Sequence, residues 1–229
     1  MNRPLLIVGN KLHATWSLRA WFLMRAFDID FDHRVLSIYQ ADSKPRLLAI
    51  SPSGRVPVLI DGDVTVWDSL AITEYLAEKH PNLTIWPRDS KARAHARSLC
   101  AEMHAEFRAL RAGCPMNLGK RFGPKDRGEA VASDVARIAQ ILRDTRTRLG
   151  GGGPCLFGEL CAVDAMFLPV LTRFETYSIS VDATTRTYMD TMLKHSAFLE
   201  WRAAALNEEW IVPKVEVDEP PIENLRKRH

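Results

Sequence analysis

The sequence predicts a small α/β domain over residues 1–80, followed by a larger all-helical domain over residues 88–229. Strand and helix signals alternate up to about residue 80, and a polar, proline-containing connection then covers residues 80–87. Beyond that connection, apolar residues recur only at the three- and four-residue spacing of helices. A chain of 229 residues can form one large domain or two small ones, and it is long enough to bury a substantial core.

The first domain is expected to have the element order βαβ and then ββα. An apolar run at residues 5–8 predicts a buried strand, and helical spacing predicts a helix over residues 16–27. Residues 33–38 alternate as a second strand, and a short helix over 44–50 ends at Ser51-Pro52. Two β-rich runs, 56–60 and 64–67, flank Asp61-Gly62-Asp63, which predicts a hairpin. A further helix is expected over residues 69–79, before Pro81.

The second domain opens with two long apolar stripes, which predict helices over about 92–110 and 131–149 that pack as an antiparallel pair. The glycine run from Gly150 to Pro154 lacks the Gly-Lys-Ser/Thr of a phosphate loop and is interpreted as a plain loop. Three more helices are expected over about 163–175, 183–194 and 196–206.

Composition excludes several classes of protein. The formal charge is only +3, with Lys and Arg diluted by nearly as many Asp and Glu, unlike a nucleic-acid binder. The basic run Arg226-Lys227-Arg228 is expected to be a solvated tail. No apolar segment is long enough for a membrane span or a signal peptide, which predicts a cytoplasmic location and no membrane partner. The four cysteines lack C-x-x-C spacing, so we expect reduced structural thiols and no metal.

The dipeptide Val56-Pro57 indicates a binding edge. Proline cannot donate to a sheet ladder, so Pro57 belongs at the start of the strand over residues 58–60. With a cis bond, the main chain of Val56 would point outward and could pair with an extended, peptide-like ligand. A trans proline that merely begins a strand explains the dipeptide equally well.

Two helix N-termini complete the candidate site. Asp68-Ser69 begins a helix whose free N–H groups favour binding of a carboxylate, and the Asp68 side chain could accept a hydrogen bond from an ammonium group. The alternative is that Ser69 serves only as the N-cap of this helix. Together with the Val56 edge, this pair suits glutathione. At the junction 13–17, a bound thiol would lie near a helix N-terminus, and Thr15 or Ser17 could donate to its sulfur unless it serves as a cap. No cysteine precedes Cys100, which argues against a protein thiol nucleophile there.

These elements, in this order, resemble the cytosolic glutathione transferases over essentially the whole chain. Residues 10–19 are similar to the N-K-x-x-S-S-W-S-L-R motif of bacterial, serine-type, zeta- and theta-like members, and residues 52–59 are similar to P-x-G-K/R-V-P-x-L. Asp68-Ser69 is similar to the E/D-S pair of the family. The resemblance implies a thioredoxin-like N-terminal domain, a helical C-terminal domain and, usually, a homodimer.

The resemblance also implies roles for individual residues. Val56, before a cis Pro57, would pair with the cysteinyl unit of glutathione, and Asp68 and Ser69 would hold its γ-glutamyl end. Arg55 would either reach a glutathione carboxylate or remain exposed. The second substrate would lie between the domains, against residues of the first loop and the first long helix: Leu12, Trp16, Met103, Phe107, Arg111 and Met116. Met103 and Phe107 fit a packing stripe better, and Trp16 could instead contact glutathione or a dimer partner.

The chain departs from the family pattern at two places. The two serines of the S-S-W-S motif are Ala14 and Thr15 here, so Thr15 is the favoured thiol-activating hydroxyl and Ser17 the reserve. The usual S/T-x-x-D box before an apolar helix is Cys161-Ala162-Val163-Asp164, in which a thiol replaces a good cap acceptor. The leading hypothesis is transfer of glutathione, as co-substrate, to a small apolar electrophile. A maleylacetoacetate-type isomerase and a non-catalytic glutathione-binding protein are the alternatives.

Overall fold

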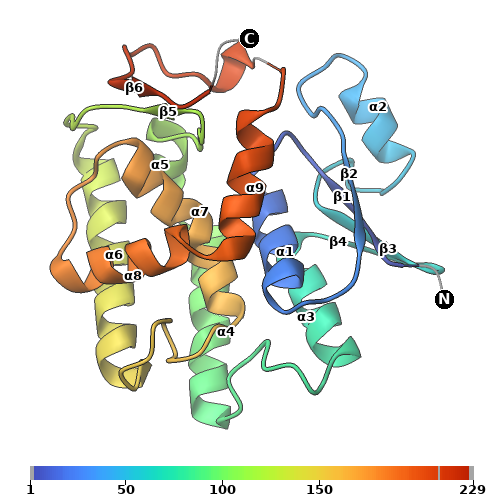
Figure 1. Ribbon diagram of the computed structural model, residues 1–229, viewed down its shortest axis with the longest axis horizontal. Helices are drawn as coiled ribbons and strands as arrows, with labels where there is room; N and C mark the ends of the chain where they lie inside the picture. Colours follow the sequence, from blue (N-terminus) through green and yellow to red (C-terminus); the bar gives the residue numbers. More distant parts are fainter. Residues whose placement is uncertain (1–2, 211, 227–229) are drawn as a thin grey trace.

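The computed structural model describes residues 3–210 and 212–226. A four-stranded sheet is formed by β1 (Leu5–Val8), β2 (Asp32–Val35), β3 (Val58–Asp61) and β4 (Val64–Trp67), in the order β2-β1-β3-β4. Strands β1 and β2 are parallel, whereas β3 is antiparallel to both β1 and β4 (Figure 1). The tight turn from Asp61 to Val64 joins the last two strands, as the hairpin signal predicts.

Helices cover both faces of this sheet because its strands are apolar on both sides. Leu6, Val8 and Leu59 face α1 (Thr15–Ala26) and α3 (Ser69–Lys79) and belong to the main core. Ile7 and Val58, one residue out of phase, form a smaller cluster with Leu47 of α2 (Ser43–Leu48). The result is a thioredoxin-like domain in which the amino end of α1 follows the carboxyl end of β1.

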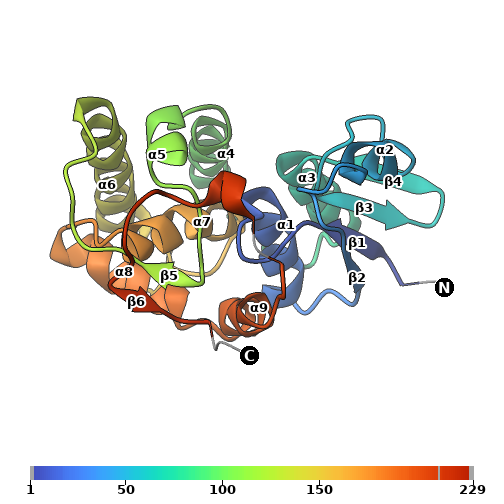
Figure 2. The same cartoon turned by 90° about the horizontal axis from the view of Figure 1, so that it is seen from above.

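The remaining helices form a bundle beside this domain. They are α4 (Ser90–Ala105), α5 (Arg108–Gly113), α6 (Glu129–Leu149), α7 (Ala162–Thr176), α8 (Ala183–Leu193) and α9 (Ser196–Leu206). Figure 2 shows the sheet on one side, the bundle on the other and α1 between them. Helix α7 is buried along almost its whole length and packs against α1, α4 and α8. No helix in the described ranges is long and apolar enough to cross a membrane.

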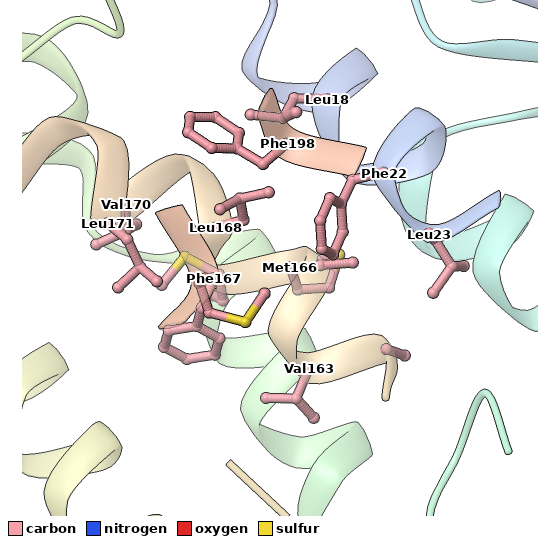
Figure 3. Packing of buried hydrophobic residues seen from close by; sticks show 14 of the residues in the cluster. Leu18, Phe22, Leu23, Val163, Met166, Phe167, Leu168, Val170, Leu171 and Phe198 are labelled. Atoms are coloured by element: carbon pink, nitrogen blue, oxygen red, sulfur yellow. The ribbon is translucent and has the colours of Figure 1, made fainter. Parts of the chain in front are cut away.

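The main hydrophobic core lies where α1, α7 and α9 meet (Figure 3). Leu18 and Phe22 of α1 extend toward Met166 and Leu168 of α7, with Phe198 of α9 beside them. All five side chains are fully buried. Because one core is shared by helices from both halves of the chain, the amino end of α1 is fixed relative to α7.

The single helix predicted over residues 92–110 is wrong. It is two helices, α4 and α5, separated at Phe107, whose φ of 64° is incompatible with a continuous right-handed helix. The apolar spacing continues across this break, because Phe107 and Leu110 are both buried in the core. Helices α4 and α6 are bridged by an ion pair between Glu102 and Arg137, but α4 packs mainly on α7, and α6 packs on α5 and α8.

A further departure from the prediction is a two-stranded ladder in the second half of the chain. Strand β5 (Lys120–Arg121) pairs with β6 (Glu223–Asn224), so this half is not entirely helical. The chain after α9 folds back over the bundle: Glu216 binds Lys120, and Glu219 binds Arg127. We call residues 207–210 and 212–226 the C-terminal segment. Arg226 donates to the carbonyl of Glu208, whereas Lys227 and Arg228 of the predicted tail lie outside the described residues.

The N-terminus of α7 has the acidic half of its capping box. The buried carboxylate of Asp164 accepts from the backbone N–H of Cys161 at 2.9 Å and of Leu156 at 3.1 Å. The hydroxyl of Tyr188 donates to the same carboxylate at 2.9 Å. Burial raises the pKa of Asp164, and these three donors oppose that rise. The carboxylate of Asp164 therefore keeps its hydrogen bond to the backbone of the N-cap residue, although that residue is Cys161 in place of the usual Ser or Thr.

Candidate functional site

The turn after β1 positions the amino end of α1. The carbonyl of Asn10 accepts from the backbone N–H groups of His13 and Ala14, at 3.0 and 2.8 Å, which turns the chain into the helix. Ala14 is the N-cap residue and contributes no side-chain acceptor. The helix therefore begins with N–H groups that no side chain caps, next to the hydroxyl of Thr15.

The two candidate hydroxyls have different surroundings. Oγ of Ser17 is fully buried and accepts from the backbone N–H of Gly9 at 3.1 Å, which ties α1 to the end of β1. Oγ1 of Thr15 accepts from Nη2 of Arg173 at 3.0 Å and lies 4.0 Å from Sδ of Met116. Both residues line the same cavity, but Ser17 has a structural partner within its own domain, whereas Thr15 faces the helical bundle.

The predicted binding edge at Val56-Pro57 has the backbone geometry that pairing with an extended ligand requires. The peptide bond between Val56 and Pro57 is cis, and Pro57 directly precedes β3. The ladder between β3 and β4 begins at Val58, so Val56 lies outside it. Within the described residues, neither the N–H nor the C=O of Val56 makes a hydrogen bond, and the residue borders the cavity. An extended ligand could therefore pair with this main chain.

The start of α3 lies at the other end of the same hollow. Asp68 is its N-cap residue, with φ of 77°, and its Oδ1 accepts from the N–H of Leu70 at 2.8 Å. Oδ2 of Asp68 lies 3.4 Å from Nε2 of His104. Oγ of Ser69 is fully buried and has no hydrogen-bond partner among the described residues. Capping is therefore performed by Asp68, and the Ser69 hydroxyl is left without a role in capping.

Two adjoining cavities connect these three features. The first, of about 480 Å³, lies between the amino end of α1, residues 54–56 and helices α5 and α7. The second, of about 590 Å³, is bordered by Val56, Pro57, Asp68, Ser69 and His104. The two share the residues Trp16, Arg55 and Val56. A ligand of three amino-acid units could extend from Asp68, past Val56, to Thr15.

The first cavity is strongly positive. Its lining includes Arg55, Arg111 and Arg173, and the described residues that line it include no Asp or Glu. Arg19, fully buried beneath it, stacks on Trp16 with its guanidinium 4.3 Å from the ring centre. Burial is the main cause that lowers the pKa of Arg19 and, to about 10, that of Arg173; Arg111 adds to both shifts. With a pKa of about 10, Arg173 remains charged at neutral pH, and an anion bound here would be stabilised.

The predicted second-substrate residues divide into two groups. Trp16, Arg111 and Met116 line the first cavity, where the guanidinium of Arg111 also stacks on Trp16 at 4.8 Å. Leu12, Met103 and Phe107 line neither cavity and are buried in the main core instead. Arg55 is exposed and borders both cavities.

Sequence reasoning missed several residues of this region, Arg173, Val215 and His104 among them. Arg173 and Val215 line the first cavity from α7 and from the C-terminal segment, and His104 borders the second from α4. Arg173 lies on a mostly apolar helix, and a buried arginine there is an unusual signal that could have indicated a site. Nothing local in the sequence distinguishes His104 or Val215.

The family model for the N-terminal domain of glutathione S-transferases matches residues 14–79, which include Thr15, Val56 and Ser69. A glutathione S-transferase-like protein, gedE of Aspergillus terreus, is 32% identical over 156 residues, which are 63% of this chain and 67% of that protein. The chain belongs to the glutathione S-transferase family.

Other relatives of the chain are named maleylacetoacetate isomerases. The maleylacetoacetate isomerase of Pseudomonas aeruginosa is 27% identical over 164 residues, 68% of this chain and 74% of that protein. A probable maleylacetoacetate isomerase of Caenorhabditis elegans is 32% identical over 98 residues, 42% of this chain. The chain spans only 44% of the length of that worm relative.

The fold of this family member agrees with solved structures. A Burkholderia glutathione transferase homologue, solved with bound glutathione, superposes with a TM-score of 0.69 at 22% identity. The match covers 90% of this chain and all of that one. At this identity the likeness concerns the fold: a thioredoxin-like domain joined to a helical bundle.

Proposed function

We propose that this chain is a glutathione transferase that binds glutathione along the two joined cavities. The observation that carries the proposal is that, among the described residues, the main chain of Val56 at the junction of the cavities and the hydroxyl of Ser69 at one end have no hydrogen-bond partner. The cysteinyl unit of glutathione pairs with Val56 beside Pro57, and the γ-glutamyl carboxylate is held by Ser69 at the start of α3. The ammonium group binds Asp68, and Arg55 attracts a carboxylate at the shared border.

The thiol of glutathione bound in this way reaches the amino end of α1. The helix N-terminus and the surrounding guanidinium groups favour the thiolate, so the thiol proton leaves to water. Thr15 donates a hydrogen bond to the sulfur, and Ser17 is the reserve donor. The thiolate then attacks an electrophilic carbon: a C–S bond forms, and either a leaving group departs with its electron pair or the adduct takes up a proton.

The electrophile binds in the first cavity, next to the sulfur. Trp16, Pro115, Met116 and Val215 provide apolar contacts for its body. Of the predicted second-substrate residues, Trp16, Arg111 and Met116 retain this proposed role. Leu12, Met103 and Phe107 act behind them by holding the walls of the cavity in place.

A glutathione-dependent isomerase of the maleylacetoacetate type is the second candidate. Two observations favour it: relatives bear that name, and the first cavity holds three arginines without a neighbouring carboxylate in its described lining. A dicarboxylic substrate would match that charge better than a neutral one.

We further propose that the chain forms a homodimer in the cytoplasm. Strand β4 is an edge strand that exposes Val64 and Trp67, with 40% and 43% of their surface accessible. A second copy that covers this edge would bury both side chains. Light scattering of the purified chain measures the mass, and a mass equal to one chain contradicts the dimer.

The central experiment combines calorimetric binding of glutathione with pH–rate profiles for its conjugation to chlorodinitrobenzene. We expect the wild-type profile to report a thiol pKa at least one unit below that of free glutathione, and Thr15→Ala to move it upward by about one unit. Isomerisation of maleylacetoacetate, measured in parallel, separates the second candidate from the first. Binding of glutathione without turnover of either substrate would instead indicate a binding protein whose activator was lost at Ala14.

A further inference from the structure

A buried arginine of the helical bundle contacts the proposed catalytic hydroxyl. The guanidinium of Arg173, on α7, donates from Nη2 to Oγ1 of Thr15 at 3.0 Å. Its other groups are also engaged: Nε donates to the carbonyl of Cys114, and Nη1 to that of Pro169, both at 2.9 Å. Three bonds, two of them to main-chain carbonyls, fix the position of the guanidinium. Arg173 is 5% exposed, so water does not compete for these contacts.

The direction of the contact with Thr15 follows from chemistry alone. A guanidinium has donors and no acceptor, so Thr15 must accept from Arg173. The single hydroxyl hydrogen of Thr15 is then available to a different partner. In the structure this hydroxyl donates to Sδ of Met116, 4.0 Å away, and a thioether sulfur is a weak acceptor that a ligand thiolate would replace. Both Thr15 and Met116 line the first cavity, so this hydrogen is available to a ligand there.

We propose that Arg173 is a positioning residue that compels Thr15 to act as a hydrogen-bond donor toward the sulfur of bound glutathione. The inference rests on the proposed function. Without such a donor, a threonine hydroxyl can rotate between donating and accepting a hydrogen bond. A hydroxyl whose hydrogen points away from the sulfur would not stabilise a thiolate. With Arg173 in place, the thiol proton passes to water, Thr15 keeps its proton, and the resulting thiolate accepts the Thr15 hydrogen bond.

The surroundings keep Arg173 available for this role. Arg111 of α5 faces it from across the cavity lining, Cys114 and Tyr177 lie beside it, and His13 and Arg55 border the cavity. Among the described residues, no carboxylate lies within 4.0 Å of its guanidinium, so its charge is not neutralised by an ion pair. The same charge polarises the Thr15 hydroxyl and strengthens it as a donor.

The contact also accounts for activation without the first serine of the family motif. Position 14 is alanine, so no hydroxyl is available there. Thr15, the next residue, is directed from a helix 158 positions later in the chain. Activation in this chain would therefore depend on the docking of α7 against α1, and not on the first loop alone.

The test is a double-mutant cycle between Thr15→Val and Arg173→Met, read out on glutathione alone. The thiolate absorbance of the glutathione complex is titrated against pH, so no electrophile is needed, and calorimetry measures the glutathione affinity of each variant. We expect Arg173→Met to lower the thiolate fraction near neutral pH about tenfold when Thr15 is present. In the Thr15→Val background the same change should lower it less than threefold, because no hydroxyl remains to be oriented.

Arg111→Met is the matched control. Arg111 carries the same charge in the same cavity but donates to the carbonyls of Met103 and Glu106, not to Thr15. Its effect on the thiolate fraction should therefore be equal in the wild-type and Thr15→Val backgrounds. An equal effect of Arg173→Met in both backgrounds would show that Arg173 acts by charge alone and would overturn the inference.

The inference can still be tested if the Arg173→Met variant does not fold. Thr15→Val removes the hydroxyl at nearly constant volume, and an unchanged thiolate fraction in this variant overturns the inference by itself. Thr15→Ser, which keeps a hydroxyl for Arg173, should retain the wild-type fraction. A wild-type chain that binds no glutathione refutes the proposed function and this inference together, whereas a wild-type chain that lowers the thiol pKa of bound glutathione only as far as Thr15→Val does refutes the inference only.

Discussion

The carboxylate of Glu208 accepts a hydrogen bond from the backbone N–H of Lys11 at 2.6 Å. Its second oxygen accepts from the N–H of Leu12 at 3.2 Å. Glu208 belongs to the C-terminal segment, whereas Lys11 and Leu12 lie in the turn that leads to Thr15. The end of the chain thus holds the first loop of the proposed site, and Nε1 of Trp201 reinforces the contact by donating to the carbonyl of Lys11.

Glu208→Ala should destabilise the protein and weaken glutathione binding together. Two backbone N–H groups lose their acceptor, which should lower the free energy of unfolding by about 1–3 kcal/mol. The turn before Thr15 is then less well fixed, so the calorimetric affinity for glutathione should also fall. Glu209→Ala, at the exposed neighbouring position, is the control and should change neither quantity. Wild-type stability of Glu208→Ala in urea would contradict the role of this contact.

Ser69→Ala should separate binding from stability. The buried Oγ of Ser69 has no partner in the described chain, so its removal costs no hydrogen bond and should change the free energy of unfolding by less than about 0.5 kcal/mol. The proposed contact with the γ-glutamyl carboxylate would be lost, and glutathione affinity should fall about tenfold. Calorimetry and urea denaturation measure the two effects. Unaltered affinity would place the γ-glutamyl group elsewhere.

Tyr188→Phe should test the buried network at the start of α7. The Tyr188 hydroxyl is one of three donors to the carboxylate of Asp164, and its loss should lower the free energy of unfolding by about 1.5–3 kcal/mol. Thr187→Ala, which removes an exposed hydroxyl bonded only within α8, should cost less than about 0.5 kcal/mol. Equal losses for the two variants would show that the contact with Asp164 has no special importance.

Acid should weaken the attachment of the C-terminal segment at Glu219. Hydrogen bonds from Arg127 lower the pKa of Glu219 below its ordinary value of 4.5 in the folded protein. The unfolded chain therefore takes up the proton first as the pH falls, so this pair's contribution is present above about pH 4.5 and is lost as the pH falls through the lower folded value.

The measurement is urea denaturation between about pH 5 and pH 3. Glu219→Gln should show a shallower loss of stability over this range than the wild type, and Glu209→Gln should follow the wild-type slope. A Glu219→Gln variant with the wild-type slope would indicate that Arg127 does not hold this carboxylate in the folded state.

Much of this architecture could be predicted because its signals are local. Strand β1, helix α3 and helix α9 have the predicted bounds, since apolar periodicity and stop residues such as Pro81 define them within a few positions. The signature around Pro57 likewise identifies the binding edge, because the required backbone geometry is encoded in consecutive residues. The local signals gave no indication of the helix break at Phe107, because the apolar spacing continues through this residue although its backbone is left-handed.

Other features depended on residues far apart in the chain. The ladder between β5 and β6 joins two-residue strands that have no pattern of their own and are about a hundred positions apart.

By itself, the sequence determined the fold class, the family resemblance and the positions of Thr15, Val56, Asp68 and Ser69. The tertiary structure alone decided their surroundings: Ser17 binds Gly9, Thr15 accepts from Arg173, and the Ser69 hydroxyl has no partner in the part of the chain that the structure describes. The physical reason is that donors and acceptors are directional and short in range, so their pairing is set by how α1, α3 and α7 pack together. That packing is a property of the whole core, and no local pattern encodes it.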